Sequence, residues 1–199
     1  MRGFLCCLLA SACALPSFAA GVWEFQGNLE DGSGNGHHAR SEKPAFAPGG
    51  KGLAAGARAE IPDTPALRLH PGFEAECRFR LDERPEGPQV LFIKDKEYML
   101  RVDWVKEGGH VSFFVHVGNQ WESRVRGPVV ETGVWYDVKV GWDGVNLSLQ
   151  TGDDKVVTQD RPGSAKATAN PLQFGAFPGV IDRIAIRNPA HAQIGRAHV

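Results

Sequence analysis

The sequence predicts an all-β protein, an antiparallel sandwich or barrel, from three observations. Residues 73–81 (FEAECRFRL) alternate strictly between apolar and charged side chains, the period of a strand with one buried face. Further short apolar segments follow at close intervals, separated by turns rich in Gly, Asn and Asp. No stretch of useful length shows the 3.6-residue period of a helix.

The expected strands follow one another through the second half of the chain. On 73–81 the apolar face, which includes Cys77, should enter the core, and the charged face should meet water. After 73–81 come expected strands at 90–94, 98–104, 110–117, 121–127, 134–142, 145–151 and 179–188. The pair Asp143-Gly144 predicts a tight hairpin between two of them.

Length and composition indicate one ordinary globular domain. The chain has 199 residues, with 22 Lys and Arg against 23 Asp and Glu, for a net charge of -1. This balance gives no sign of a nucleic-acid-binding protein. The 24 glycines and 13 prolines favour many turns. We therefore expect residues 20–190 to form a single, monomeric module.

The first 19 residues have the pattern of a secretory signal peptide. Arg2 precedes an apolar run from 4 to 15, and Ser17 and Ala19 are the small residues expected at a cleavage site after Ala19. The run is too short to span a bilayer, which needs about 20 residues. We predict a secreted protein, extracellular or periplasmic, with no membrane span. Cleavage would leave Cys77 as the one cysteine, so no internal disulfide is expected.

The last nine residues, 191–199, are expected to be a tail outside the domain. Residues 194–199 (IGRAHV) resemble the translation of a common sequencing adapter, so we expect the natural chain to continue differently after about Gln193. A natural basic tail is the alternative.

An ordered series of short segments suggests a family. The series is WEFQGNLED (23–31), SGNGHHA (33–39), PGF (71–73), GVWYDV (133–138), GWDG (141–144), NPLQFG (170–175) and GVIDRI (179–184). Over residues 22–190 it resembles the laminin-G-like, concanavalin-A-like jelly-roll domains of secreted bacterial proteins. The resemblance implies two antiparallel sheets packed face to face in about a dozen strands. It also implies glycan binding or adhesion, often with calcium at the rim, and places Trp135 and Trp142 at core or hairpin positions, where we expect them to be buried.

The segment LEDGSGNGHHARSE (29–42) is the candidate metal site. The spacing of its acidic and amide side chains is close to that of a calcium-binding loop. The residues on either side, however, are strand-like before the segment and include a proline after it, where a calcium loop of this type has helices. Two interpretations remain open: a calcium site using Asp31, Asn35 and the distant Asp182, or a turn in which these side chains bond their own backbone. Gln26 stands where relatives often carry Asp, which weakens the first interpretation.

Trp104 and Trp121 are the candidate glycan-binding residues. Each lies at a strand end among polar residues, where an indole can remain exposed for stacking on a sugar ring; partial packing in the core is the alternative for both. A glycoside hydrolase needs a pair of carboxylates, and the sequence shows none at a recognisable spacing. Glu74 and Glu76 share one face of a strand, but they belong to its alternating charged face and are expected to meet water.

The first functional hypothesis is a secreted, non-catalytic module that binds a polysaccharide or a glycosylated surface, with calcium as the candidate ion. The alternative is a structural or adhesion module of a longer, truncated surface protein. A glycan-cleaving enzyme is the third hypothesis.

Overall fold

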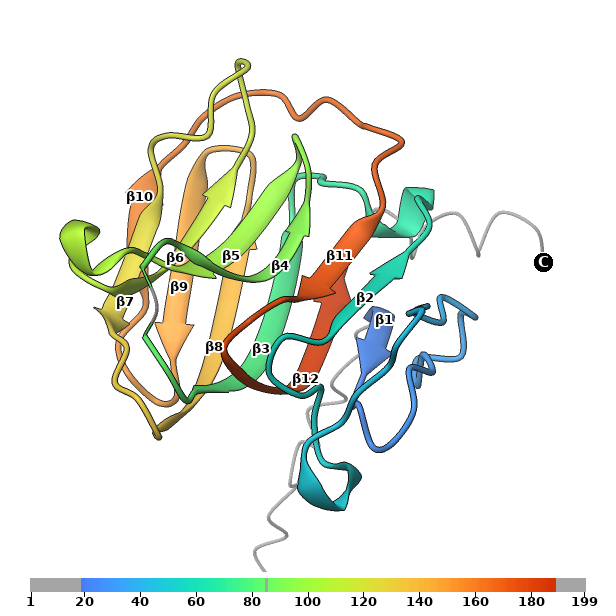
Figure 1. Ribbon diagram of the computed structural model, residues 1–199. Coiled ribbons are helices and arrows are strands. Elements are labelled where there is room, and N and C mark those ends of the chain that lie inside the picture. The colour runs from blue at the N-terminus through green and yellow to red at the C-terminus, as the bar shows by residue number, and fades with distance from the viewer. Residues whose placement is uncertain (1–18, 85, 189–199) are drawn as a thin grey trace, which may run out of the picture.

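The computed structural model describes residues 19–84 and 86–188. Within these residues twelve strands form two six-stranded antiparallel sheets, which stack face to face (Figure 1). The predicted all-β antiparallel sandwich is confirmed, and the two separate sheets decide against a barrel. Of the predicted signal peptide 1–19, residues 1–18 lie outside the described residues, as does the whole predicted tail 191–199, while Ala19 is the first residue of β1.

The first sheet contains both the earliest and the latest strands. Its order is β1 (Ala19–Trp23), β12 (Gly179–Arg187), β3 (Phe73–Leu81), β8 (Trp135–Trp142), β9 (Asn146–Thr151) and β10 (Val157–Asp160). The second sheet has the order β2 (Arg58–Ile61), β11 (Leu172–Gly175), β4 (Gln89–Lys94), β5 (Tyr98–Val102), β6 (His110–Val115) and β7 (Val125–Val129).

Helical structure in the described residues is limited to three 3-10 turns. These are η1 (Pro48–Gly50), η2 (Pro65–Leu67) and η3 (Val105–Glu107). None of the described helical segments has the length and apolar character needed to cross a bilayer.

One expected strand begins four residues later than predicted. The strand expected at 121–127 is β7, which starts at Val125, so Trp121 lies in the preceding loop. The guanidinium of Arg161 donates hydrogen bonds to the backbone carbonyls of Val117 and Gln120 and holds this loop as a turn. A long-range contact that the local sequence does not reveal therefore overrides the strand pattern.

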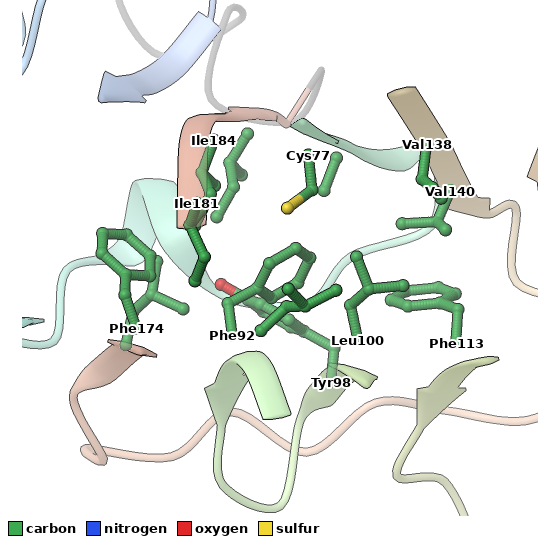
Figure 2. Packing of buried hydrophobic residues seen from close by; sticks show 14 of the residues in the cluster. Cys77, Phe92, Tyr98, Leu100, Phe113, Val138, Val140, Phe174, Ile181 and Ile184 are labelled. Atoms are coloured by element: carbon green, nitrogen blue, oxygen red, sulfur yellow. The ribbon is translucent and has the colours of Figure 1, made fainter. Parts of the chain in front are cut away.

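The core lies between the two inner faces (Figure 2). Figure 2 shows Cys77, Val138, Val140, Ile181 and Ile184 of the first sheet facing Phe92, Tyr98, Leu100, Phe113 and Phe174 of the second. Aromatic rings connect the layers: Phe73 of β3 lies with its ring centroid 4.5 Å from that of Tyr98. Cys77 is buried as predicted, and burial raises the pKa of its thiol.

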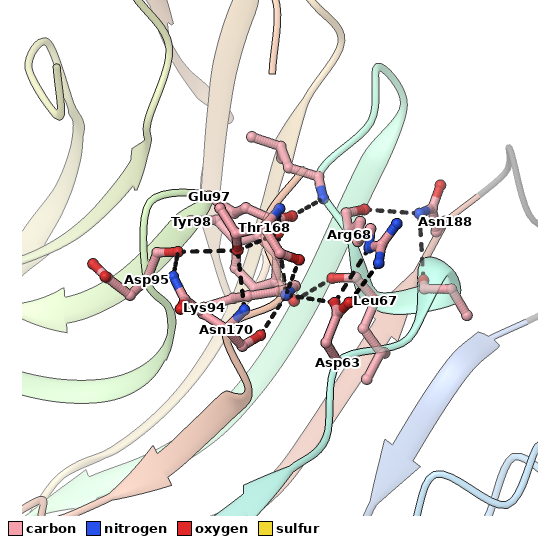
Figure 3. A network of polar contacts seen from close by, with 12 residues as sticks. Asp63, Leu67, Arg68, Lys94, Asp95, Glu97, Tyr98, Thr168, Asn170 and Asn188 are labelled. Atoms are coloured by element: carbon pink, nitrogen blue, oxygen red, sulfur yellow. Dashed lines mark hydrogen bonds and ion pairs between the residues drawn. The ribbon is translucent and has the colours of Figure 1, made fainter. Parts of the chain in front are cut away.

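A buried ion-pair cluster fixes one rim of the sandwich (Figure 3). The ammonium group of Lys94, which is fully buried, lies 2.8 Å from Asp63 Oδ1 and 3.1 Å from Glu97 Oε1. It also donates to the backbone carbonyls of Thr168 and Asn170. Four oxygens from three separate segments thus surround one cation, which ties those segments together.

Candidate functional site

The outer face of the first sheet is an open polar surface along β3 and β8. Because side chains alternate along a strand, the even-numbered residues of β3 and the odd-numbered residues of β8 point away from the core. The antiparallel register places these outward residues opposite one another: Glu74 and Gly141, Glu76 and Lys139, Arg78 and Asp137, Arg80 and Trp135. We call this surface the outer face.

Trp135 stands at one end of the outer face and is 37% exposed. The guanidinium carbons of Arg78 and Arg80 each lie 5.2 Å from the centroid of its ring, within the range of a cation–π contact. These contacts hold the indole in place while leaving part of it open to solvent. The predicted burial of Trp135 is wrong, because Asp137 and Lys139 share its parity on β8 and the whole row faces outward.

Ion pairs cross the outer face between neighbouring strands. The guanidinium of Arg78 lies 2.7 Å from Asp137 of β8 and 3.4 Å from Asp182 of β12. Lys139 lies 3.3 Å from Glu74. These side chains are partly exposed, so each pair contributes little to stability, but together they fix the positions of the charged groups.

Glu76 lies at the centre of one such set. Its carboxylate accepts hydrogen bonds from Arg183, at 3.1 Å, and from Arg187, both on β12. Burial alone would raise the pKa of Glu76, but the hydrogen bonds and the charges of the two arginines outweigh it and the pKa is lowered. The group is therefore held as a carboxylate and is a poor candidate for a general acid.

Two shallow hollows lie along the outer face. The first hollow, of about 210 Å³, is lined by Glu76, Arg78, Asp137, Lys139, Gln150 and Arg183, with Cys77, Val138 and Gly152. The second hollow, of about 320 Å³, is lined by Glu74, Asp143, Asn146, Ser148 and Thr158, with Gly72, Phe73, Gly141 and Trp142. Both hollows present groups that accept or donate hydrogen bonds, as sugar hydroxyl groups require.

Gly141 lines the second hollow at a position where a side chain would have little room. A Cβ atom at this position would lie 3.0 Å from Ser148 Oγ and 3.2 Å from the carbonyl oxygen of Phe73. The missing side chain therefore lets Glu74 and Ser148, which flank Gly141 on the neighbouring strands, lie close to the backbone of β8, and Gly141 itself is buried.

The loop after β1 is organised by Asp31, which is 6% exposed. Its Oδ1 accepts from the backbone N–H groups of Val22 (2.9 Å) and Ser33 (2.8 Å), and its Oδ2 from Ser33 Oγ (2.8 Å) and the N–H of His37 (3.0 Å). Burial alone would raise the pKa of Asp31, but these hydrogen bonds lower it. The carboxylate bonds its own loop, as the turn interpretation expects.

Of the three predicted calcium ligands, two lie close together. Asn35 donates to Ser33 Oγ, which in turn donates to Asp31, and Asn35 also bonds the carbonyl of Ala19. Asp182 instead contacts Arg78 on the outer face. Within the described part of the chain, no group of three or more His, Cys, Asp or Glu side chains is placed to hold a metal ion. Calcium at Asp31 stays a prediction.

The two predicted glycan-binding tryptophans lie at opposite ends of β6. Trp104 precedes this strand, is 39% exposed and has the ammonium group of Lys106 5.5 Å from its ring centroid. Trp121 follows the strand and packs its ring edge-on against His116, with centroids 5.1 Å apart. Strand β6 has six residues, or about 20 Å, so the two rings cannot contact one sugar residue. Neither lines the two hollows.

Solved structures similar to this chain are β-sandwich domains. The binding domain of botulinum neurotoxin serotype D superposes with a TM-score of 0.65 at 10% identity, covering 86% of this chain and 47% of that one. The chain thus spans about half the length of the toxin binding domain. Domain 4 of AbnA, a GH43 extracellular arabinanase from Geobacillus stearothermophilus solved with arabinotriose, gives a TM-score of 0.62 at 15% identity and covers 88% and 97%.

A third similar structure is the CBM40 of the Ruminococcus gnavus IT-sialidase, bound to α2,3-sialyllactose. Its TM-score is 0.52 at 11% identity, with 75% of this chain and 90% of that chain covered. At these identities the likeness shows the β-sandwich fold alone. No protein-family profile and no curated protein sequence matches the chain.

Proposed function

We propose that this protein is a non-catalytic carbohydrate-binding module that holds a polysaccharide or a glycosylated surface on the outer face of its first sheet. The proposal rests on one observation: an exposed indole, Trp135, heads a row of hydrogen-bonding side chains that contains two hollows. The likeness to a CBM40 solved with sialyllactose and to an arabinanase domain solved with arabinotriose supports it.

The chemistry of such a site follows from its parts. A sugar ring has an apolar C–H face, which packs on an indole, and a rim of hydroxyl groups, which bond polar side chains. Trp135 provides the flat apolar surface, and its cation–π contacts with Arg78 and Arg80 reduce the entropy lost when a ligand orders it. Asp137, Lys139 and neighbouring residues provide the hydrogen bonds.

The proposal includes a family, a location and an ion. Membership of the laminin-G-like, concanavalin-A-like jelly-roll domains agrees with the two-sheet fold, and secretion rests on the signal pattern in residues 1–19. Calcium at Asp31 would be a structural addition near β1. The adhesion-module alternative predicts binding to a cell surface but to no isolated glycan, and the enzyme alternative predicts release of reducing sugar.

The test is binding of a panel of soluble polysaccharides, measured by affinity electrophoresis and calorimetry, to wild type and to Trp135→Ala. We expect Trp135→Ala to weaken binding by at least about tenfold, because truncating an aromatic residue that anchors a ligand typically costs about 2 kcal/mol or more. Trp104→Ala and Trp121→Ala are matched variants that test the two residues predicted from the sequence.

Three results would contradict parts of the proposal. Loss of binding in Trp104→Ala or Trp121→Ala, with Trp135→Ala unaffected, would move the site to the second sheet. A panel with no ligand at all would reject carbohydrate binding. Reducing sugar released by wild type would establish an enzyme.

A further inference from the structure

We infer that the outer face selects uncharged glycans and binds them along β8, from Trp135 to the second hollow. The inference rests on the proposed function and adds to it the charge class of the ligand and the path that the ligand takes across the sheet.

The path follows from the geometry of one strand. Trp135, Asp137, Lys139 and Gly141 are the successive outward positions of β8, and they span about 20 Å at roughly 3.4 Å per residue. The first hollow includes Asp137 and Lys139, and the second includes Gly141. An extended sugar chain lying along β8 would therefore contact the indole and both hollows in turn.

The charge class follows from the pairing of the basic side chains on this surface with carboxylates. The bases and acids pair as Lys139 with Glu74, Arg183 and Arg187 with Glu76, Arg78 with Asp137 and Asp182, and Arg80 with Asp82. Five positive side chains thus meet five negative ones. To pair with a basic side chain on this surface, a sugar carboxylate or sulfate would have to displace the protein carboxylate that already pairs with it.

The first hollow shows this competition directly. Three of its lining side chains are basic, Arg78, Lys139 and Arg183, yet each lies within 3.3 Å of a carboxylate. A sugar carboxylate could pair with one of these bases only by replacing the carboxylate already beside it, so the exchange of one partly exposed ion pair for another gains little affinity.

The second hollow excludes anions more simply. Among the described residues that line it, Glu74 and Asp143 are acidic and none is basic. The pKa of Asp143 is lowered by hydrogen bonds from the backbone N–H groups of Asn146 and Val145, so this carboxylate stays charged. An acidic sugar would meet like charges here, and like charges across a contact disfavour binding.

Hydroxyl groups meet no such barrier. A hydroxyl group can donate to a carboxylate oxygen without breaking the ion pair that the carboxylate forms, and it can accept from an amide or another hydroxyl. Gln150 in the first hollow and Asn146, Ser148 and Thr158 in the second provide both functions. The surface therefore suits a ligand that is rich in hydroxyl groups and carries no net charge.

The test compares neutral and acidic glycans on the same protein. The probes are arabinan, xylan and a β-glucan against polygalacturonate and alginate, and lactose against sialyllactose, by calorimetry at about 50 and about 500 mM NaCl. We expect the neutral members to bind at least about tenfold more tightly, with little dependence on salt because no ion pair forms with the ligand. Tighter binding of acidic members, or a steep loss with salt, overturns the inference.

A charge-removing variant tests the cause. Glu74→Gln frees Lys139 and removes a carboxylate from the second hollow, so the ratio of acidic to neutral affinity should rise by about tenfold. Glu60→Gln, which removes the same charge from the exposed side of β2 in the other sheet, is the matched control and should leave that ratio unchanged. An unchanged ratio in Glu74→Gln contradicts the inference.

The two failures are distinguishable. If no glycan binds, the proposed function itself is wrong. If acidic glycans bind on the outer face and Trp135→Ala removes that binding, the function stands and only the selectivity inferred here is wrong.

Discussion

At the scale of single residues, Asp31 shows how one buried carboxylate can order a loop that has no regular structure. Its four hydrogen bonds reach back to β1 and forward to His37, so both ends of the turn depend on one side chain. A carboxylate has about four lone-pair positions, and each bond here uses one. A calcium ion would have to share or displace these donors.

We predict that Asp31→Ala lowers the free energy of unfolding by about 2–4 kcal/mol, because it takes the shared acceptor away from the partly buried donors of Val22, Ser33 and His37. Asp31→Asn keeps one oxygen at the Oδ1 position, which accepts two of the four bonds, and should lose about half as much. Urea unfolding followed by fluorescence measures both changes.

The same variants decide the question of calcium. If Asp31 acts through its loop alone, wild type and Asp31→Ala should show the same melting temperatures in millimolar calcium and after chelation. A rise in the melting temperature of wild type with calcium that is lost in Asp31→Ala would instead establish an ion at this residue.

At the scale of elements, Lys94 joins the end of β4 to two segments that are distant in sequence. Asp63 precedes η2, and Thr168 and Asn170 precede β11. A single ammonium group therefore bonds the segments that lead into these two elements (Figure 3). Carboxylate and carbonyl oxygens such as these could surround a bound cation, and here they surround the ammonium group of Lys94.

We predict that Lys94→Met destabilises the protein by about 3–5 kcal/mol, since Glu97 would remain buried and charged without its ion-pair partner, while Asp63 would keep only Arg68. Lys43→Met, at an exposed position, is the matched control and should change stability by less than about 0.5 kcal/mol. Chemical unfolding measures both. The double variant Lys94→Met/Glu97→Gln removes one uncompensated charge and should recover part of the loss; no recovery would contradict this account.

The elements that could be predicted are those whose burial alternates over many residues. β3 agrees with its predicted bounds and β8 begins one residue late, at Trp135, because both strands bury one full face. β2, β10 and β11 were not predicted. Each has only four residues, and β10 is exposed along its whole length, so its sequence has no alternation to detect.

The candidate site could be predicted in part. The parity of Asp137 and Lys139 on β8 would have placed Trp135 outside, so the signal was present in the sequence. The ion pairs between β12 and β3, such as Arg183 with Glu76, could not be predicted, because they depend on the pairing of strands that are more than 100 residues apart.

At the scale of the whole molecule, four carboxylates in separate regions have lowered pKa values. They are Asp31 in the first loop, Asp63 in the rim cluster, Glu76 on the outer face and Asp143 in the β8–β9 hairpin. The pKa of Asp63 is lowered mainly by its hydrogen bond to Arg68, and further by Lys94. No disulfide restrains the described residues, where Cys77 is free, so the stability of the sandwich depends on such contacts and on the core.

These shifts predict that acid destabilises the fold. A carboxyl group whose pKa is lower in the folded than in the unfolded state leaves the unfolded chain with more bound protons as the pH falls. The stability that such a group gives the fold is complete when the pH is above its ordinary pKa, 3.8 for Asp and 4.5 for Glu. That stability is lost as the pH falls through the lowered pKa of the folded state. The urea midpoint should therefore be constant near pH 6–7 and fall steadily below about pH 5. Asp143→Asn, which removes one of the four groups, should give a shallower fall. A midpoint equal at pH 7 and pH 3 would contradict the prediction, because the unfolded chain would then bind no more protons than the folded one.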